Sequence, residues 1–376
     1  MKKNIFIALM AFAAIISCGK TADPQKLARP VPTLSSAGPD NATITWKAVA
    51  NAESYEIVVN DAVYSVTGTT IYLNGLQPST YYTLKMKAVA PEGSSRWLDS
   101  DYCPAFCFST ERHTIRVATL NVRSGVMSES SAEHEWNNRK KGVCAWAAAS
   151  QPDVICTQEC HPNQRAEIIN LCPDYLAIYH TDSQNVIFYR KGAMTVQSYG
   201  SFWLVDGAPT SVDKTSVQAN ERSATWMKCT FSGRKMLILD THLSYRTAQN
   251  SDSNSHEMQQ LRSYEMKVIT TWLDSNYNPS SDGCLLFMGD FNIDQGNAIF
   301  NGWKDGTYGY YARDKAPGAD TGRTFNNWGG SGQLTIDHQF YSGFPSVLSY
   351  KIDRASYGGI TYISDHWPVV VEYRMD

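Results

Sequence analysis

The sequence lacks an excess of charge of either sign. Its 376 residues include 33 Lys and Arg against 36 Asp and Glu, a formal net charge of −3 at pH 7. Proteins that bind duplex nucleic acid tightly gather Lys and Arg over the surface that contacts the phosphates, and no basic run stands out in this sequence. The charge balance therefore argues against a dedicated duplex-DNA binder, without excluding a nuclease.

Hydrophobic runs long enough to cross a membrane are also lacking, since no stretch approaches the ~20 apolar residues that a spanning helix needs. A shorter run at residues 5–16 follows Lys2-Lys3, which is the layout of an export signal. The tetrapeptide Ile15-Ile16-Ser17-Cys18 resembles the bacterial lipobox, whose cysteine is lipidated and becomes the new N-terminus. We therefore expect residues 1–17 to be a lipoprotein signal peptide. Cys18 would anchor the protein in the bacterial cell envelope, on the periplasmic side or at the cell surface.

A zinc-type pairing of cysteine with histidine is the third absence, and it argues against a Cys/His zinc site. Cys103 and Cys107 flank a tripeptide and are close enough in sequence for a local disulfide. The cysteines that lie inside apolar runs are expected to be buried thiols: Cys144, Cys156, Cys229 and Cys284.

The length exceeds what one ordinary core fills and predicts two domains. Residues 18–28 are polar and without periodicity, as in a flexible stalk. From residue 29 to residue 110, short alternating strands separated by turns predict a small all-β sandwich. Segment 76–82, followed by Gly93-Ser94-Ser95, resembles the fibronectin type III module, with Trp46 as its core tryptophan and Tyr82 as its corner tyrosine. The resemblance implies a seven-stranded sandwich that serves as a spacer, and no sequence feature favours a ligand on it.

Residues 113–376 begin with a pattern of strand, helix and strand. Residues 114–121 form a strand that ends at Asn121, and 154–159 form a buried strand that ends at Glu159. The helix predicted between them, 136–150, has apolar residues on one side and Lys and Arg on the other. The two strands of such a unit are parallel, so Asn121 and Glu159 should meet at one edge of a sheet.

Other polar residues also follow apolar runs. The run 285–288 ends at Gly289, and Asp290 and Asn292 then share one face because they are two residues apart on an extended chain. Such strand ends are where α/β sheets usually carry their chemistry. His242 ends another strand, and Asp337 and Asp365-His366 lie at the edges of the last two. An amphipathic helix is predicted over 258–273, and the Gly- and Asn-rich segment 305–333 is predicted to be a long irregular loop facing the substrate.

Taken together, these motifs resemble the endonuclease/exonuclease/phosphatase family, in the family's order and from residue 114 onward. The resemblance implies an α/β fold of two packed mixed β-sheets flanked by helices, a four-layer sandwich. Family members cleave phosphoesters with Mg²⁺ or Mn²⁺, on substrates that include nucleic acids, phosphoinositides and sphingomyelin. The motifs are Thr119-Leu120-Asn121, Gln158-Glu159, Thr241-His242-Leu243, Gly289-Asp290-Phe291-Asn292, Ile336-Asp337 and Ser364-Asp365-His366.

The residue types suit metal-assisted attack of water on phosphorus. A hard divalent cation takes oxygen ligands and keeps several waters, so one or two carboxylates suffice, and it stabilises charge on the leaving oxygen. We expect Glu159 to be the first ligand, with Asn121 beside it and Asp365 as a second ligand.

The remaining roles follow from the resemblance. His366 activates water or stabilises the phosphorus centre, and Asp337 fixes its tautomer. Asp290 and Asn292 orient the attacking water, with the choice of base between Asp290 and His366 left open. His242 donates to a phosphoryl oxygen. Arg222 is either a phosphate contact, which a guanidinium fork suits, or half of a surface ion pair.

The chain departs from the family pattern at a few positions next to these motifs. Asp240 replaces the usual Asn before Thr-His, Ser244 replaces Asp or Asn after His-Leu, and His338-Gln339 follow Asp337 in place of aromatic and aliphatic residues. We expect these changes to alter pKa values and not the ligand set. His338 points to the opposite face of its strand from Asp337 and is expected to be structural.

The sequence thus predicts a monomeric metal-dependent phosphoester hydrolase that uses an Asp–His dyad. Its substrate would be a phosphorylated small molecule, a phospholipid headgroup or a nucleic acid. An extracellular nuclease and a non-catalytic adhesion lipoprotein are the alternatives. Loss of Glu159, Asp290 or His366 would have favoured the non-catalytic alternative, and all three residues are present.

Overall fold

The computed structural model describes residues 23–204, 222–245, 252 and 255–376. The predicted signal peptide and Cys18 lie outside these residues. The chain divides into two compact units, one of Met1–Thr33, Ile44–Ile71 and Leu84–Phe106, the other of Leu34–Thr43, Tyr72–Thr83 and Cys107–Asp376. Within the described ranges, no helix is both long and apolar enough to cross a membrane.

The N-terminal part is built of strands, as the sequence predicts. One sheet has the order β2-β3-β6, a second has the order β5-β4-β7-β9, and β1 pairs with β8. Strand β4 buries every second residue, as a strand with one core face does. Trp46 is 7% exposed and packs edge-on against Tyr55. The all-β sheets are therefore confirmed, and their identity as a fibronectin type III-like sandwich stays a prediction. The strands are β1 (Gln25–Lys26), β2 (Thr33–Ala37), β3 (Asn41–Thr45), β4 (Ser54–Val59), β5 (Ala62–Val66), β6 (Thr70–Asn74), β7 (Tyr81–Val89), β8 (Trp97–Leu98) and β9 (Phe106–Ser109).

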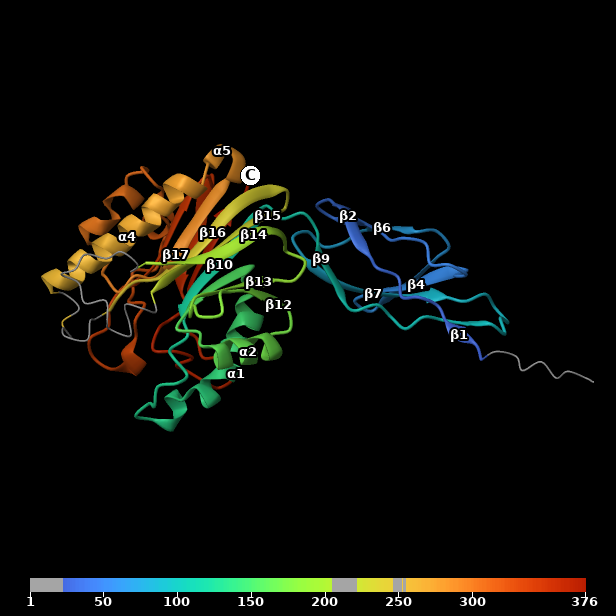
Figure 1. Ribbon diagram of the computed structural model, residues 1–376, viewed down its shortest axis with the longest axis horizontal. Coiled ribbons are helices and arrows are strands. Elements are labelled where there is room, and N and C mark those ends of the chain that lie inside the picture. Colours follow the sequence, from blue (N-terminus) through green and yellow to red (C-terminus); the bar gives the residue numbers. More distant parts are fainter. Residues whose placement is uncertain (1–22, 205–221, 246–251, 253–254) are drawn as a thin grey trace, which may run out of the picture. The chain divides into compact units, whose positions relative to one another are not determined.

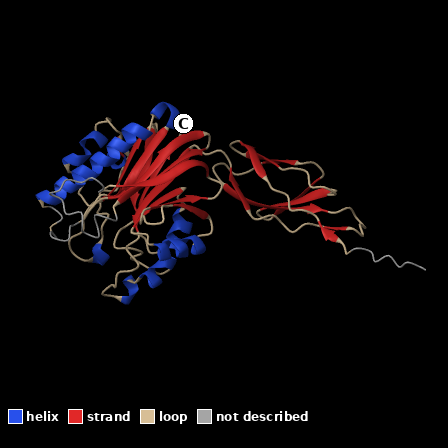
Figure 2. Cartoon of the chain, viewed as in Figure 1, coloured by secondary structure: helices blue, strands red, loops and turns tan. Residues whose placement is uncertain are grey.

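Residues from β10 onward form two six-stranded mixed sheets, which Figure 2 shows between helices. The first sheet has the order β12-β13-β11-β10-β21-β20, and the second has the order β14-β15-β16-β17-β19-β18. The first contains β10 (Thr114–Asn121), β11 (Val154–Gln158), β12 (Tyr175–Ile178), β13 (Val186–Arg190), β20 (Ser346–Ile352) and β21 (Val369–Arg374). The second contains β14 (Met194–Trp203), β15 (Ser223–Phe231), β16 (Arg234–His242), β17 (Cys284–Asp290), β18 (Tyr310–Tyr311) and β19 (Asp337–Ser342).

Helices cover the outer faces of the two sheets (Figure 1). Helices α1 (Trp136–Ser150) and α2 (Pro162–Leu171) pack on the first sheet, and α4 (His256–Asn276) packs on the second. Apolar side chains from both sheets fill the space between them, so the central strands are buried on both faces. This double burial explains why the sequence of β17 is a continuous apolar run. The predicted four-layer α/β fold is confirmed. The short helices are α5 (Pro279–Asp282), α6 (Ala312–Lys315), η1 (Ala132–His134), η2 (Ala298–Trp303) and η3 (Asn327–Gly329).

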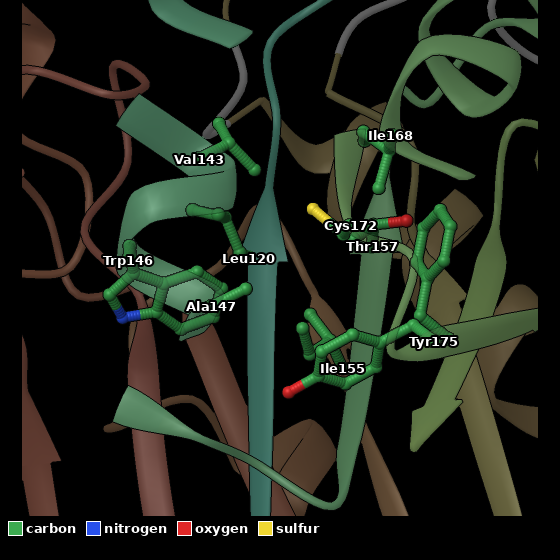
Figure 3. A pocket seen from close by; sticks show the side chains of 10 residues that line it. Leu120, Val143, Trp146, Ala147, Ile155, Thr157, Ile168, Cys172 and Tyr175 are labelled. Atoms are coloured by element: carbon green, nitrogen blue, oxygen red, sulfur yellow. The ribbon is translucent and has the colours of Figure 1, made fainter. Parts of the chain in front are cut away.

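A small pocket between α1, α2 and the first sheet is lined almost entirely by apolar side chains, including Trp146, Ile155 and Tyr175 (Figure 3). At its edge a disulfide joins Cys144 of α1 to Cys172, the residue after α2, whose Cα atoms are 5.7 Å apart. The expected Cys103–Cys107 disulfide is wrong, because both cysteines are free. The expected free thiol at Cys144 is also wrong, since the side-by-side packing of α1 and α2 brings it to a partner 28 residues away.

Two further expectations need correction. Segment 305–333, expected to be irregular, contains β18, α6 and η3. Helix α1, expected to keep its Lys and Arg residues away from the core, buries Arg139 completely. The guanidinium donates to the backbone carbonyls of Val122 and Ile363. These hydrogen bonds satisfy donors of a residue that the sequence pattern placed in solvent.

A polar contact crosses the core just below the sheet edge. Gln158 of β11 donates its Nε2 to Asp240 Oδ1 of β16 at 2.6 Å, and both residues are fully buried. Burial raises the pKa of Asp240 well above its usual range. The other oxygens of the pair, Gln158 Oε1 and Asp240 Oδ2, have no hydrogen-bond partner among the described residues. A proton on Asp240 Oδ2 keeps this buried side chain neutral, while Oδ1 still accepts from Gln158 Nε2.

The substitution Asp240→Asn tests this protonation. A carboxyl whose folded-state pKa is raised stabilises the fold below its unfolded pKa, and that stability is lost as pH rises toward the folded pKa. Asparagine keeps the amide geometry without an ionisable proton. We expect the free energy of unfolding of Asp240→Asn relative to wild type to grow between pH 5 and pH 9, by at most about 1.4 kcal/mol per pH unit. Denaturant titrations at several pH values measure this, with the exposed Asp274→Asn as control. A difference independent of pH contradicts the neutral acid.

Candidate active site

Strand ends from both sheets meet at one edge of the sandwich. β10 and β11 run parallel with Asn121 opposite Gln158, and β16 and β17 run parallel with His242 opposite Asp290. Asn121 joins the two sheets, because its Nδ2 donates to Glu159 Oε1 and to Asp290 Oδ2, each at 3.0 Å. The predicted meeting of Asn121 and Glu159 is confirmed.

Two of the predicted residues adopt left-handed backbone conformations that the sequence pattern does not reveal. Glu159 has φ 58° and Asn292 has φ 51°. Such a conformation is unfavourable for a residue with a side chain, less so for Asn. Hydrogen bonds hold both residues, since Glu159 Oε2 accepts from the Ser124 amide and the Asn292 amide donates to Asp290 Oδ1. Turning the chain sharply after each strand brings these side chains back over the sheet edge.

Gly289 sets the approach of β17 to β16. Its φ is 151°, and a Cβ atom here would lie 1.9 Å from the carbonyl oxygen of Thr241. A larger residue would therefore push apart the two strands that carry Asp290 and His242. The glycine is needed for close packing of the backbone beside the site.

His366 and Asp337 form a buried ion pair. His366 Nδ1 lies 2.9 Å from Asp337 Oδ2 and 3.1 Å from Asp337 Oδ1. Burial opposes the charged ring, but Asp337, together with Asp290 and Asp365, raises the pKa of His366 to about 10. The Asp337 amide donates to Thr324 Oγ1, which fixes the strand that carries the carboxylate. His366 is thus a cation at neutral pH, with Nε2 turned toward Asp290 at 3.8 Å.

Asp290 and Glu159 have opposite electrostatic environments. Burial raises the pKa of Asp290 to about 7, and the nearby Asp337 adds to the effect. Burial also opposes the charged form of Glu159, but His242, the Asn121 amide and Arg123 lower its pKa to about 2. Asn121 and Arg123 lower the pKa of Glu159 even when His242 is neutral. The site therefore holds one firmly ionised carboxylate and one that exchanges a proton near neutrality.

His242 lies between Arg222 and Asp290. Arg222 Nη1 is 2.8 Å from His242 Nδ1, and His242 Nε2 is 3.4 Å from Asp290 Oδ2. Burial and the adjacent guanidinium push the pKa of His242 well below its usual range. Because a guanidinium only donates, Nδ1 must accept, and we assign the ring proton to Nε2. Arg222 is 6% exposed and is not half of a surface ion pair. The side-chain nitrogen of Asn292 lies 3.0 Å from His242 Nε2, where two donors face each other without a hydrogen bond, and it donates to the Leu243 carbonyl.

Asp365 lies beside Ser364 and Arg123. Ser364 Oγ donates to the backbone carbonyl of Asn121 and lies 3.2 Å from Asp365 Oδ1. Burial raises the pKa of Asp365, and the negative charge of Glu159 adds to the effect. Arg123 Nε is 3.7 Å from Asp365 Oδ2. Asp365 and Glu159 are thus close enough to repel one another.

The donor set fits a hard divalent cation. Buried carboxylates that repel one another at one edge concentrate negative charge, which a divalent cation offsets. Carboxylate and amide oxygens are the preferred ligands of such a cation. In the described part of the chain, ligand atoms of Asp290, Asp337 and His366 also lie within 4.8 Å of one another. Both oxygens of Asp337 already face His366, however, so this cluster fits a dyad better. Asn121 turns its amide nitrogen toward the acids and its oxygen toward the Arg123 amide.

Two residues that position the site carry no recognisable signal in the sequence. Arg139 connects the segments after Asn121 and before Ser364 through its carbonyl contacts. Thr324 accepts from the Asp337 amide through Oγ1, and its carbonyl accepts from the Trp367 amide, so it contacts the chain next to both members of the dyad. Each is an ordinary residue in a helix or loop. No spacing or composition signal distinguishes them, because their role depends on distant parts of the chain.

The residues that depart from the family pattern have local partners. Ser244 donates through its amide and its hydroxyl to Glu265 of α4, and burial raises the pKa of Glu265 to about 7. His338 faces the other side of β19, as predicted, where it contacts the Tyr311 hydroxyl and the Ile293 carbonyl. Burial lowers the pKa of His338 to about 4, so the ring is neutral and structural.

Comparison with known structures finds proteins of similar fold. A *Bacteroides thetaiotaomicron* endonuclease/exonuclease/phosphatase family protein is 21% identical, with a TM-score of 0.57 over 70% of this chain and 98% of that chain. A *Bacteroides vulgatus* family protein is 20% identical, with a TM-score of 0.56 over 70% of this chain and 100% of that chain. A mannosyl-6-phosphatase of *B. thetaiotaomicron* is 21% identical, with a TM-score of 0.55 over 69% of this chain and 99% of that chain.

These structural likenesses show the shared fold. No curated protein matches the chain. A sequence model of the endonuclease/exonuclease/phosphatase family matches residues 118–366, which span all the motifs from β10 to His366. The chain therefore belongs to the endonuclease/exonuclease/phosphatase family.

Proposed function

We propose that the protein is a metal-dependent phosphoester hydrolase that activates water at the edge shared by the two sheets. The observation that carries this proposal is the bridge made by Asn121, which brings Glu159 and Asp290 together within reach of the His366–Asp337 pair. Family membership supports a phosphoester substrate. The similarity to a protein named mannosyl-6-phosphatase is in line with a small phosphorylated molecule.

Glu159 and Asp365 would hold the divalent cation, Mg²⁺ or Mn²⁺, with the Asn121 side chain beside them. When bound, such a cation offsets the negative charge of the substrate and stabilises charge on the leaving oxygen. Arg123 and Asn121 keep Glu159 ionised and ready to bind.

Asp290 would accept the proton of the attacking water. Its raised pKa of about 7 matches a general base working near neutral pH, whereas His366 already carries a proton and cannot accept another. The imidazolium of His366 would instead stabilise charge that develops on the phosphoryl oxygens, and Asp337 keeps it oriented and charged. His242 and Asn292 would donate to the phosphoryl group, with Arg222 fixing the His242 tautomer. The bond from phosphorus to the leaving oxygen breaks as the bond to water forms. The leaving oxygen takes up a proton from solvent, and Asp290 then releases the proton of the attacking water to solvent.

Substitution of Glu159 and His366 tests the site. We expect Glu159→Gln to raise the Mg²⁺ concentration for half-maximal activity at least ~10-fold, because a neutral amide binds the cation more weakly. We expect His366→Ala to lower kcat about 10²- to 10⁴-fold. Hydrolysis of an aryl phosphate, a bis-aryl phosphate, sphingomyelin and single- and double-stranded DNA is measured, with the exposed Glu133→Gln as control. Unchanged activity in both variants would refute the site, and faster cleavage of DNA than of the small esters would favour the nuclease alternative.

The pH profile tests the division of roles between Asp290 and His366. A base with a pKa of about 7 must lose its proton to act, and an imidazolium with a pKa of about 10 must keep its own. We therefore expect kcat/KM to rise through pH 7, reach a plateau and fall toward pH 10. Asp290→Asn should lower the rate and abolish the rise near pH 7. A rise that persists in Asp290→Asn shows that another group is the base.

We also propose that the protein is tethered to the cell envelope by a lipid on Cys18, which supports action on substrates outside the cytoplasm. The export signal and lipobox-like residues of the sequence carry this proposal. In cells, wild-type protein should partition into the detergent phase of a phase-separating detergent, while Cys18→Ser should remain in the aqueous phase. Identical partitioning of the two would exclude lipidation at this residue.

A further inference from the structure

Arg123 is a partly exposed guanidinium with unused hydrogen-bond donors beside the site. Its Nε donates to Glu129 Oε1 at 2.7 Å and lies 3.7 Å from Asp365 Oδ2, and the side chain is 28% exposed. Its Nη1 and Nη2 atoms make no hydrogen bond to any described residue. Arg222 differs, because it is 6% exposed and its Nη1 is directed at His242. Of Arg123, Arg139 and Arg222, the arginines described at the site, Arg123 is thus the one that can reach an incoming anion.

The backbone of Arg123 is fixed by contacts to the site itself. The residue has φ 56°, an uncommon value for a residue other than glycine. Its amide donates to Asn121 Oδ1, and its carbonyl accepts from Gln164 Nε2 and Arg139 Nη2. These three contacts fix the backbone, and the hydrogen bond from Nε to Glu129 Oε1 fixes the side chain. The guanidinium is therefore held in place before any ligand arrives.

The acids near Arg123 do not account for all of its donors. Asp365, Glu129 and Glu159 all favour the charged form of Arg123. If Arg123 served only to neutralise these acids, its positive charge and the hydrogen bond from Nε to Glu129 would be sufficient. When Glu159 and Asp365 are engaged by a cation, their charge no longer offsets the guanidinium. The two terminal nitrogens then present a planar pair of donors, the geometry that matches two phosphate oxygens.

We propose that Arg123 binds the terminal oxygens of a phosphomonoester dianion, and that the site thereby prefers monoesters to diesters. A monoester has three terminal oxygens and up to two negative charges, whereas a diester has two terminal oxygens and one charge. His366, His242 and Asn292, with the cation, serve the two terminal oxygens that monoesters and diesters share. The Arg123 fork then contacts the third terminal oxygen of a monoester together with one of the other two. This inference rests on the proposed phosphoester hydrolysis and names the substrate class of that site.

The experiment compares an aryl phosphate monoester with a bis-aryl phosphate diester in the full-length, Mg²⁺-loaded protein. Arg123→Gln should lower kcat/KM for the monoester about 10- to 100-fold, the effect expected for loss of a hydrogen bond to a charged group. At a Mg²⁺ concentration that saturates both proteins, which removes any effect of Arg123 on the cation through Glu159, it should change kcat/KM for the diester less than about threefold. Arg123→Lys, which keeps the charge without the planar fork, should fall between wild type and Arg123→Gln. An equal loss with both substrates overturns the proposal.

Two matched variants separate binding from a structural role. Glu129→Gln removes the partner of Nε and keeps the guanidinium, so it should leave the monoester-to-diester ratio unchanged. If Arg123 only anchors the segment that carries Glu129, this variant should reproduce the effect of Arg123→Gln, which contradicts the proposal. Arg123→Gly removes the side chain and relieves the left-handed backbone. It should show the same loss of monoester preference as Arg123→Gln, and a retained preference in this variant also contradicts the proposal.

A binding measurement keeps the inference testable apart from turnover. Calorimetric titration of the Mg²⁺-loaded protein with inorganic phosphate should give a dissociation constant about 10-fold or more higher in Arg123→Gln. Titration with diphenyl phosphate should be unchanged, and Glu129→Gln should bind both ligands as wild type does. Equal phosphate affinity in wild type and Arg123→Gln refutes the role of Arg123. If His366→Ala and Glu159→Gln retain wild-type hydrolysis, the proposed function fails instead, whatever the phosphate titrations show.

Discussion

The hydrogen bonds from the Asn121 amide to carboxylates on two different sheets are the constraint on which the site depends. Glu159 follows a strand of the first sheet and Asp290 ends a strand of the second, so their distance is set by how the sheets pack. The central strands are buried on both faces, and the apolar core between the sheets holds the two carboxylates at that distance. Just below, the Gln158–Asp240 contact joins the same two sheets a second time. The packing of the apolar core between the two sheets thus determines where the charged side chains of the site lie.

Much of the fold and part of the site follow from local sequence patterns. The strand–helix–strand pattern of residues 114–159 predicted two parallel strands, and this brought Asn121 to Glu159 although 38 positions separate them. The apolar run before Asp290 and Asn292 predicted that both lie at a strand end. Their spacing predicted a shared face on an extended chain, but β17 ends at Asp290 and Asn292 is left-handed. The partnership of His366 with Asp337 needed the family resemblance, because nothing local in the sequence indicates which strands become neighbours.

Other features could not be predicted because they depend on tertiary contacts. Burial of Arg139 requires carbonyls from two distant segments, and a helical pattern places a charged residue in solvent by default. The left-handed conformation of Glu159 opposes its intrinsic preference and exists because Ser124 and Asn121 hold the carboxylate. The disulfide between Cys144 and Cys172 follows from the packing of two helices, while spacing alone favoured a nearer pair.

The disulfide also affects the site through α1. Cys144 and Arg139 lie on the same helix, so the covalent bond to Cys172 restrains the helix whose guanidinium holds the carbonyls of Val122 and Ile363. Disulfides persist outside the cytoplasm and are reduced within it. In a reducing compartment both thiols would be free, and packing alone would retain α1. In an oxidising compartment the disulfide would add a covalent restraint to the helix whose Arg139 holds the residues that flank Asn121 and Ser364.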